Sequence, residues 1–237
     1  MKVEILYSSV ANLYGEAVDI RYLKMCLPEA EFIETELNDV PAFVNDDVDM
    51  IYMGPMTENT QELIIEKLSA YKGRINELID AGKVFLVIGN ALEIFGNYIE
   101  NEDGSKIEGL GIFNTYAKRK MLSRYNCLFL GELEGIKIVG FKAQFSQSYS
   151  EGNVDGLFRR IKGAGLNPEC DTEGVRRNNF MGTYILGPIL ILNPDFTKYL
   201  LKLLGITDRA LPCEEDIRKA YIQRLGEFEK NDIQIYG

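Results

Sequence analysis

The sequence predicts an α/β protein of the three-layer, flavodoxin-like class, with helices on both faces of a mostly parallel central sheet and an edge rich in antiparallel hairpins. In the first half of the 237 residues, apolar runs of strand length alternate with segments of helical periodicity. In the second half, short strand candidates follow one another between glycine-containing turns. No linker, internal repeat or low-complexity stretch divides the chain, so residues 1–237 are expected to form a single domain.

Short apolar runs that end in turns predict four strands in the first half. They lie at Val3–Tyr7, Glu31–Leu37, Val48–Met53 and Lys83–Ile88. Amphipathic spacing predicts a helix at Glu16–Leu27 and one long helix at Asn59–Asp80. Pro55 lacks the N–H that a strand ladder needs and so ends the third strand, and Gly82 stands where a helix C-cap is expected.

The run Lys83–Ile88 has the length and apolar character of a central parallel strand that is buried on both faces. The tight turn Gly89-Asn90-Ala91 follows at once, and a short helical segment then extends to Phe95. A turn between such a strand and a helix lies at the C-terminal edge of the sheet, where open α/β sheets bind their ligands. We therefore expect the functional site around Gly89.

The second half is expected to form hairpins and then two helices. Glycine- and aspartate-containing turns are predicted over residues 97–111, and strands at Cys127–Leu130, Lys137–Phe141 and Phe180–Tyr184. Apolar residues at helical spacing predict a helix at Phe196–Leu204, with Asn193 or Asp195 as its cap, and a charged helix at Glu214–Glu229.

Composition excludes several classes of function. The chain has 26 Lys plus Arg against 36 Asp plus Glu, and it has no histidine. Every mechanism that needs an imidazole is therefore closed, including the Ser-His-Asp triad, the Cys-His dyad and metal sites with histidine ligands. The acidic balance argues against nucleic-acid binding, which needs clustered cations. The one dense basic run, Lys118-Arg119-Lys120 with Arg124 nearby, is expected to be a solvated face, and the alternative is contact with an anionic ligand or with the nucleotide edge of a partner.

The four cysteines and the apolar pattern indicate a soluble, cytoplasmic protein. The cysteines are far apart and contain no C-x-x-C pair: Cys26, Cys127, Cys170 and Cys213. This spacing suits neither a zinc site nor a disulfide framework, so no metal and no other cofactor is expected. No signal-peptide pattern and no run of about 18 apolar residues is present, and membrane insertion is therefore not expected.

Six segments, in order along nearly the whole chain, match the motifs of one known family: Asn12–Glu16, Gly54–Gln61, Ile88–Gly96, Gly109–Thr115, Gly140–Gln144 and Gly182–Pro188. With these motifs the chain resembles the class I glutamine amidotransferases of the CobB/CobQ-like kind. The resemblance is strongest to the GatD-type glutaminase subunits of cell-wall amidation, which act on lipid II with a Mur-ligase-like, ATP-dependent partner. It implies the fold of that family and a partner of that kind.

The resemblance also implies where catalytic groups should stand, and this sequence departs from the pattern there. A thiolate on the strand–helix elbow and an adjacent imidazole perform glutamine hydrolysis in this class. The thiol's position holds Gly89, the imidazole's position holds Leu186, and the position of a second family histidine holds Gln144. Both members of the dyad are absent from these positions.

The supporting residues depart from the family pattern as well. The family's glycine triplet, which places oxyanion donors near the substrate, corresponds to Gly54, Pro55 and Met56, and Pro55 has no N–H. Glu93 replaces a glutamine-type residue on the helix after the elbow. We therefore expect a protein that has kept the fold without glutaminase activity, with no confirmed catalytic residue and without an established capacity to bind glutamine.

Three functions remain open from the sequence. The first is a degenerate amidotransferase subunit that serves as scaffold or partner of a Mur-ligase-like enzyme. The second is a small-molecule binding or regulatory module. The third is another type of enzyme that uses Glu58, Glu93 and nearby hydroxyls as acid and base. A glutaminase with a relocated nucleophile, such as Ser146 or Ser148 on an expected loop, is not favoured. The expected pocket-lining residues are Gly54, Pro55, Met56, Glu58, Gly89, Asn90, Glu93 and Gln144.

Overall fold

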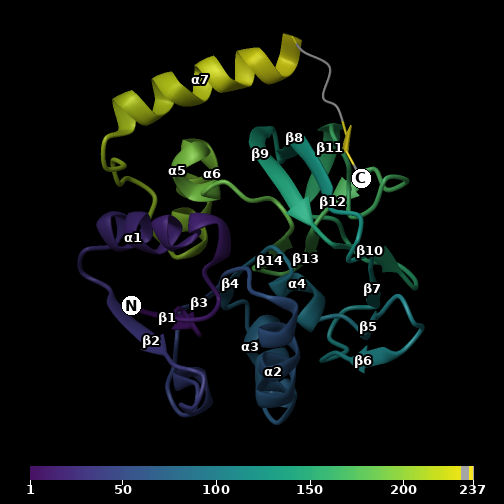
Figure 1. Cartoon of the computed structure of the whole chain (residues 1–237). Coiled ribbons are helices and arrows are strands. Elements are labelled where there is room, and N and C mark those ends of the chain that lie inside the picture. The colour runs from purple at the N-terminus through teal and green to yellow at the C-terminus, as the bar shows by residue number, and fades with distance from the viewer. Residues whose placement is uncertain (231–234, 237) are drawn as a thin grey trace.

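A computed structural model describes residues 1–230 and 235–236, and its centre is a six-stranded sheet (Figure 1). The strand order is β13-β14-β4-β3-β1-β2. The strands are β1 (Lys2–Leu6), β2 (Glu31–Thr35), β3 (Met50–Met53), β4 (Val84–Ile88), β13 (Val175–Arg177) and β14 (Phe180–Thr183). All neighbours run parallel except the edge strand β13, which is antiparallel to β14. The predicted α/β class with a mostly parallel sheet is confirmed.

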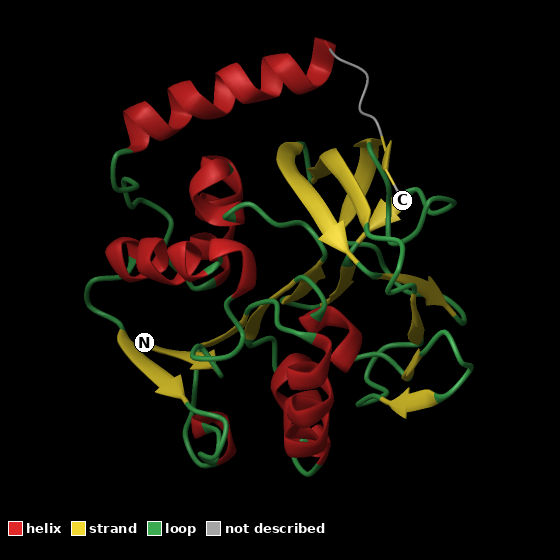
Figure 2. Cartoon of the chain, viewed as in Figure 1, coloured by secondary structure: helices red, strands yellow, loops and turns green. Residues whose placement is uncertain are grey.

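Helices cover both faces of this sheet (Figure 2). One face carries α1 (Ala17–Cys26), α5 (Ile189–Leu192) and α6 (Pro194–Leu203), and the other carries α2 (Glu58–Ser69), α3 (Lys72–Asp80) and α4 (Ala91–Ile94). Strand alternation fills the two cores, because Ile51 and Met53 point to the α2 and α3 side while Met50 and Tyr52 point to the α1 and α6 side. Strand β4 is buried along its whole length, as expected for a central parallel strand.

The prediction of one long helix over Asn59–Asp80 is wrong, because the chain forms the two helices α2 and α3 there. Tyr71 leaves the helical path (φ −108°, ψ 5°), and its ring packs edge-on against Phe43 with 6.1 Å between the ring centroids. An aromatic contact outside the helix therefore interrupts an otherwise continuous amphipathic pattern. Gly82 follows α3 with φ of +77°, as predicted for a C-terminal glycine.

The hairpins of the second half form two small sheets beside the central one. The first contains β5 (Tyr98–Glu100), β6 (Lys106–Glu108), β7 (Thr115–Arg119) and β10 (Ser146–Ser150). The second contains β8 (Tyr125–Leu133), β9 (Ile136–Gln144), β11 (Phe158–Lys162), β12 (Thr172–Glu173) and β15 (Ile235–Tyr236). Two predictions are corrected here. The turns expected over residues 97–111 contain β5 and β6, and Ser146 and Ser148 lie on a strand rather than a loop.

The last two helices, α6 and α7 (Glu214–Lys230), both pack against β9. Asn193 stands at the N-cap of α6, but its side chain instead pairs with the backbone N–H and carbonyl of Val139 on β9 (2.8 and 2.9 Å), so the predicted capping bond is absent. Helix α7 crosses β8 and β9 and buries Tyr221 against them. Among the described residues, the structure contains no helix long and apolar enough to cross a membrane.

Candidate functional site

The chain turns sharply at Gly89, between β4 and α4. Gly89 has φ of +67°, a left-handed conformation that other residues adopt only with strain and that is typical of a nucleophile elbow. Its N–H donates to the carbonyl of Thr183 on β14 (2.7 Å). A Cβ atom on Gly89 would lie 2.6 Å from the Cβ of Pro55, far inside van der Waals contact. The elbow keeps its backbone shape but has no room for a side chain.

The turn that covers Gly89 is fixed by Asn90. The Asn90 side chain accepts a hydrogen bond from the N–H of Met56 (3.0 Å) and donates to the carbonyl of the same residue (2.8 Å). Since Pro55 has no N–H and the N–H of Met56 is already bonded, neither residue has a free backbone donor for an oxyanion. Asn90 thus belongs to the framework of the site.

A cavity of about 200 Å³ lies beside the elbow. It is smaller than the ~300–1,000 Å³ of most sites for drug-sized ligands. Seven of the nine expected site residues line it: Pro55, Met56, Glu58, Gly89, Asn90, Gln144 and Leu186. Gly54 and Glu93 do not line it. A Cβ on Gly54 would lie 2.5 Å from the carbonyl oxygen of Ala11, so the close approach of the two backbone segments requires glycine at this position.

Leu186 and Gln144, which resemblance aligns with family imidazoles, both reach this cavity. Leu186 is buried and pairs with Phe141 through two backbone hydrogen bonds of 2.8 and 3.2 Å. Gln144 donates from its Nε2 to the carbonyl of Ser146, while its buried Oε1 accepts no hydrogen bond from any described residue. Neither side chain can exchange a proton near neutral pH as an imidazole does.

Glu93 lies behind the cavity wall at the centre of a buried polar network. Its Oε1 accepts from the hydroxyl groups of Tyr184 (2.8 Å) and Ser146, and its Oε2 accepts from Nε2 of Gln61 (2.9 Å). Burial raises the pKa of Glu93, and these three donors oppose that effect. The hydroxyl of Ser148 completes the network at 2.6 Å from that of Tyr184. Only Glu58 of the two predicted carboxylates is at the cavity.

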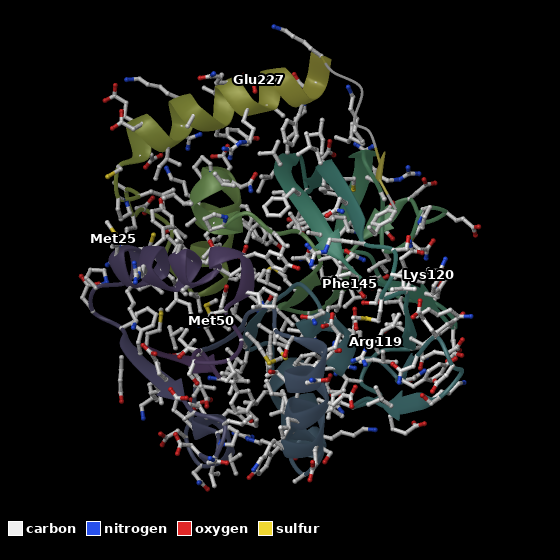
Figure 3. The ribbon with its side chains drawn as sticks, in the orientation of Figure 1. Met25, Met50, Arg119, Lys120, Phe145 and Glu227 are labelled. Atoms are coloured by element: carbon white, nitrogen blue, oxygen red, sulfur yellow. The ribbon has the colours of Figure 1, made fainter. Side chains whose placement is uncertain are left out.

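Arg119 connects this network to helix α2. Its guanidinium donates to Oε1 of Gln61 (2.7 Å), to Oε1 of Glu62 (2.8 Å) and to Asn101 (3.1 Å), and only 7% of the residue is exposed. Figure 3 shows Arg119 near Lys120 and Phe145 at the end of β7. The prediction that the whole basic run is solvated is therefore wrong for Arg119, because alternation along β7 turns it inward.

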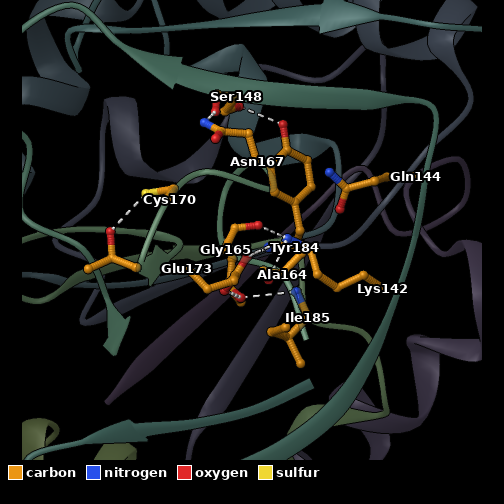
Figure 4. Close-up of polar contacts among 12 residues, drawn as sticks. Lys142, Gln144, Ser148, Ala164, Gly165, Asn167, Cys170, Glu173, Tyr184 and Ile185 are labelled. Atoms are coloured by element: carbon orange, nitrogen blue, oxygen red, sulfur yellow. Dashed lines mark hydrogen bonds and ion pairs between the residues drawn. The ribbon is translucent and has the colours of Figure 1, made fainter. Parts of the chain in front are cut away.

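A buried ion pair lies under the ring of Tyr184 (Figure 4). The ammonium of Lys142 lies 3.8 Å from Oε1 of Glu173 and 5.2 Å from the centroid of the Tyr184 ring, and it donates to the carbonyl of Gly165. Glu173 also accepts from the N–H of Tyr184 (2.8 Å) and from the hydroxyl of Thr183. Burial lowers the pKa of Lys142 and raises that of Glu173, while their mutual attraction opposes both shifts.

No cysteine supplies a thiol to the cavity. All four are free, and none belongs to its lining. Burial raises the pKa of Cys26 to about 11 and also raises that of Cys127, so both stay thiols at neutral pH. In the part of the chain that the structure describes, no cluster of three or more Cys, Asp or Glu is placed to hold a metal ion.

Comparison with known proteins identifies the family. The sequence model of one protein family, the CobB/CobQ-like glutamine amidotransferase domain, matches residues 2–193. The chain belongs to this family. Two curated members resemble it over most of its length, and both are the GatD subunit of a glutamine-hydrolysing lipid II isoglutaminyl synthase. The Staphylococcus aureus (strain N315) protein is 30% identical over 83% of this chain and 78% of its own. The Streptococcus pneumoniae (strain ATCC BAA-255 / R6) protein is 28% identical over 92% of this chain and 86% of its own.

Solved structures agree with this family at the level of the fold. A glutamine amidotransferase structure matches with a TM-score of 0.53 and 13% identity, over 86% of this chain and 99% of its own. A Thermotoga maritima glutamine amidotransferase matches with a TM-score of 0.50 and 11% identity, over 96% of this chain and 98% of its own. The amidotransferase fold is therefore kept at very low sequence identity.

Sequence reasoning missed several residues of this amidotransferase-like site. Period-two alternation from Thr115 through Ala117 to Arg119 is a local signal that would have placed Arg119 inward. Ser146 lines the cavity, although a loop was expected there. No local signal joins Lys142 to Glu173, because the two residues come from different strands and meet only in the folded chain.

Proposed function

We propose that this chain is a degenerate GatD-type amidotransferase subunit that has lost glutamine hydrolysis. The observation that carries the proposal is the elbow, where glycine stands under Pro55 with 2.6 Å between a would-be Cβ and the proline Cβ. The chain has no histidine that could activate a nucleophile brought from elsewhere. Nucleophile and base are thus lacking together, and Pro55 and Met56 offer no free oxyanion donor.

The proposed role is that of a cytoplasmic scaffold or partner subunit for a Mur-ligase-like, ATP-dependent amidating enzyme. Support comes from the two curated relatives, which are named as subunits of lipid II isoglutaminyl synthases and match most of this chain. In such a complex the degenerate chain would stabilise the ligase, and free ammonia would serve as nitrogen donor. The amidation of a cell-wall precursor is the proposed pathway.

A glutaminase assay tests the loss of activity. The purified chain, alone and with a candidate partner, is incubated with glutamine, and ammonia and glutamate are measured. We expect no release above the rate without protein. Variants Ser146→Ala and Glu93→Gln, together with serine substitutions of the four cysteines, identify any relocated nucleophile or base. Hydrolysis at enzyme-like rates would contradict the proposal, and loss of that activity in one variant would name the residue responsible.

Affinity purification tests the partner. The tagged chain, expressed in its own cell type, is expected to retain a Mur-ligase-like protein in a defined stoichiometry through a subsequent gel-filtration step. The ligase's amidation rate with ammonium chloride as donor should then rise when the chain is present. A chain that elutes alone, and that changes neither the stability nor the ammonia-dependent rate of the ligase, would count against the scaffold role.

A second candidate is binding of a small molecule in the elbow cavity. The favouring observation is the Oε1 atom of Gln144, which is buried, lacks a partner and belongs to a cavity-lining residue. A donor on a ligand could satisfy that atom, while Arg124 at the same cavity could neutralise an anionic group. Differential scanning fluorimetry with amino acids and nucleotides tests this, and a shift abolished by Gln144→Leu would support it. No shift with any compound would argue for the scaffold role alone.

A further inference from the structure

A second cavity, of about 340 Å³, lies next to the elbow cavity and has no part in the function proposed above. It lies between the ends of β7 and β8, the start of β10 and the loop that contains Pro168. Its side chains include two cations and several neutral donors: Lys118, Lys120, Ser123, Tyr125 and Gln147. No lining residue is acidic, although acidic residues outnumber basic ones by 36 to 26 in the chain. Such a lining favours an anion with several acceptor oxygens.

The positive charge at this cavity is only partly neutralised. The ammonium of Lys118 lies 3.5 Å from Oε1 of Glu100, an exposed pair that solvent screens. Among the described residues, no carboxylate forms an ion pair with Lys120 or Arg124. Arg124 instead lies over the ring of Phe145, with 4.5 Å between its guanidinium carbon and the ring centroid. Within a protein of net charge −10, this is a local region that can attract an anion.

Tyr125 supplies an independent observation. It lines the cavity and is 6% exposed, and none of residues 1–230 and 235–236 forms a hydrogen bond with its buried hydroxyl. An unsatisfied buried hydroxyl costs free energy, so a ligand acceptor at this position would be stabilising. Gln147 uses its Oε1 to accept from the hydroxyl of Tyr149 (3.1 Å), which directs its remaining hydrogen-bonding capacity toward donation. Both groups suit an acceptor-rich ligand.

The anion cavity and the elbow cavity share one wall. Phe145 lines both, and Arg124, which packs on its ring, lines the elbow cavity. The strand residues Tyr125 and Gln144, each with an unpartnered buried polar atom, are direct cross-strand neighbours of β8 and β9. Phe145 is therefore part of the wall between the two cavities.

We propose that this second cavity is a binding site for a phosphate group, held by Lys118, Lys120, Ser123 and the hydroxyl of Tyr125. The phosphate could belong to a free metabolite or to a lipid headgroup. Leu122, at the tip of the turn between β7 and β8, is 97% exposed and stands next to the site, where it could contact an apolar part of the same ligand. This site does not depend on the loss of glutaminase activity, so either inference can fail without the other.

Isothermal titration calorimetry with inorganic phosphate and diphosphate tests the site on the full chain. We expect saturable binding, tighter for diphosphate, that is weakened about three- to tenfold by Lys120→Gln. The matched control is Lys67→Gln, which removes one exposed charge on α2 and should leave the affinity unchanged. Absence of saturable binding, or equal affinities in the two lysine variants, would overturn the proposal.

Tyr125→Phe separates a ligand role from a structural one. Because the hydroxyl has no partner in the part of the chain that the structure describes, its removal should leave thermal stability unchanged or raise it, while diphosphate affinity falls about threefold or more. Full affinity in this variant would refute the role of the hydroxyl in the site.

Vesicles identify the source of the phosphate. The chain has no tryptophan, so Leu122→Trp introduces a single fluorescent reporter at a fully exposed position. A blue shift with vesicles of phosphatidylglycerol and phosphatidylcholine, but not with phosphatidylcholine alone, assigns the site to lipid headgroups. Diphosphate binding without any vesicle response assigns it to a free phosphorylated compound. Absence of both diphosphate binding by calorimetry and a vesicle response would overturn the proposal.

Discussion

Restoring a thiol at the elbow should destabilise the protein without restoring catalysis. In Gly89→Cys, the cysteine must adopt the left-handed backbone conformation of Gly89 (φ +67°), which costs about 1–2 kcal/mol for a residue with a Cβ. The new Cβ also lies 2.6 Å from the Cβ of Pro55, and overpacking of this kind costs about 1–3 kcal/mol more. We expect a total loss of about 2–5 kcal/mol, which is a large part of the ~5–15 kcal/mol that holds a typical domain folded.

The steric part of this cost is specific to one neighbour and can be measured by a double-mutant cycle. Pro55→Gly removes the opposing Cβ, so Gly89→Cys should cost about 1–3 kcal/mol less in that background than in the natural one. Urea denaturation followed by circular dichroism gives the four free energies of unfolding. Gly89→Ala is the control for the Cβ atom alone, and it should match Gly89→Cys closely. Neither cysteine variant should release ammonia from glutamine, since the chain has no imidazole to activate the thiol.

Two results would refute this reasoning. If the two substitutions prove additive within ~0.5 kcal/mol, Pro55 does not exclude a side chain from the elbow. If Gly89→Cys with Pro55→Gly hydrolyses glutamine at enzyme-like rates, the missing histidine is not the barrier to catalysis.

Three further perturbations follow from buried or helical positions. Burial raises the pKa of Asp19 in the folded protein well above its usual value. The protonated carboxyl group therefore stabilises the fold fully below the unfolded-state pKa of about 3.9, and this stabilisation declines as the pH rises toward the folded-state pKa. Urea unfolding at pH 5 and pH 8 should therefore show Asp19→Asn gaining on the natural protein at the higher pH, and an equal difference at both would contradict this. Arg119→Ala should cost about 2–4 kcal/mol because it leaves the buried Oε1 of Gln61 without its donor and removes the ion pair with Glu62. The exposed neighbour Lys120→Ala should change stability by less than ~0.5 kcal/mol. Thermal unfolding compares the two variants, and equal losses would contradict this prediction. Gly226→Ala, inside α7 with nothing within 4 Å of the new methyl, should raise the unfolding free energy by about 0.5–1 kcal/mol in the same measurement, and a loss would show that the position is not free.

Elements with a strong local pattern were predicted well. The fully apolar run that became β4 and the charged stretch that became α7 were located within one or two residues. The break at Tyr71 was not predicted, because the aromatic contact with Phe43 that accompanies it joins residues far apart in sequence. Strand β10 was likewise missed, since a run of serine, glutamine and tyrosine forms a strand there only by pairing with β7.

For the candidate site, likewise, one part was predictable from the sequence and another was not. Its place at the end of β4 was predictable because parallel strands bring their carboxyl ends to one edge. Which side chains reach the cavity was not predictable from the sequence. Glu93 was expected to line the cavity but lies behind its wall, where it accepts hydrogen bonds from Tyr184, Ser146 and Gln61. Burial of that kind depends on which distant strands lie alongside α4.

By itself, the sequence determined the fold class, the family and the absence of an imidazole, because periodicity, motif order and composition are properties of the linear chain. Only the tertiary structure decided that Pro55 covers Gly89, that Arg119 points inward, and that a basic cavity adjoins the elbow across Phe145. Each of these depends on distances between segments that are far apart along the chain. Strand register and packing set those distances, and no local pattern encodes them.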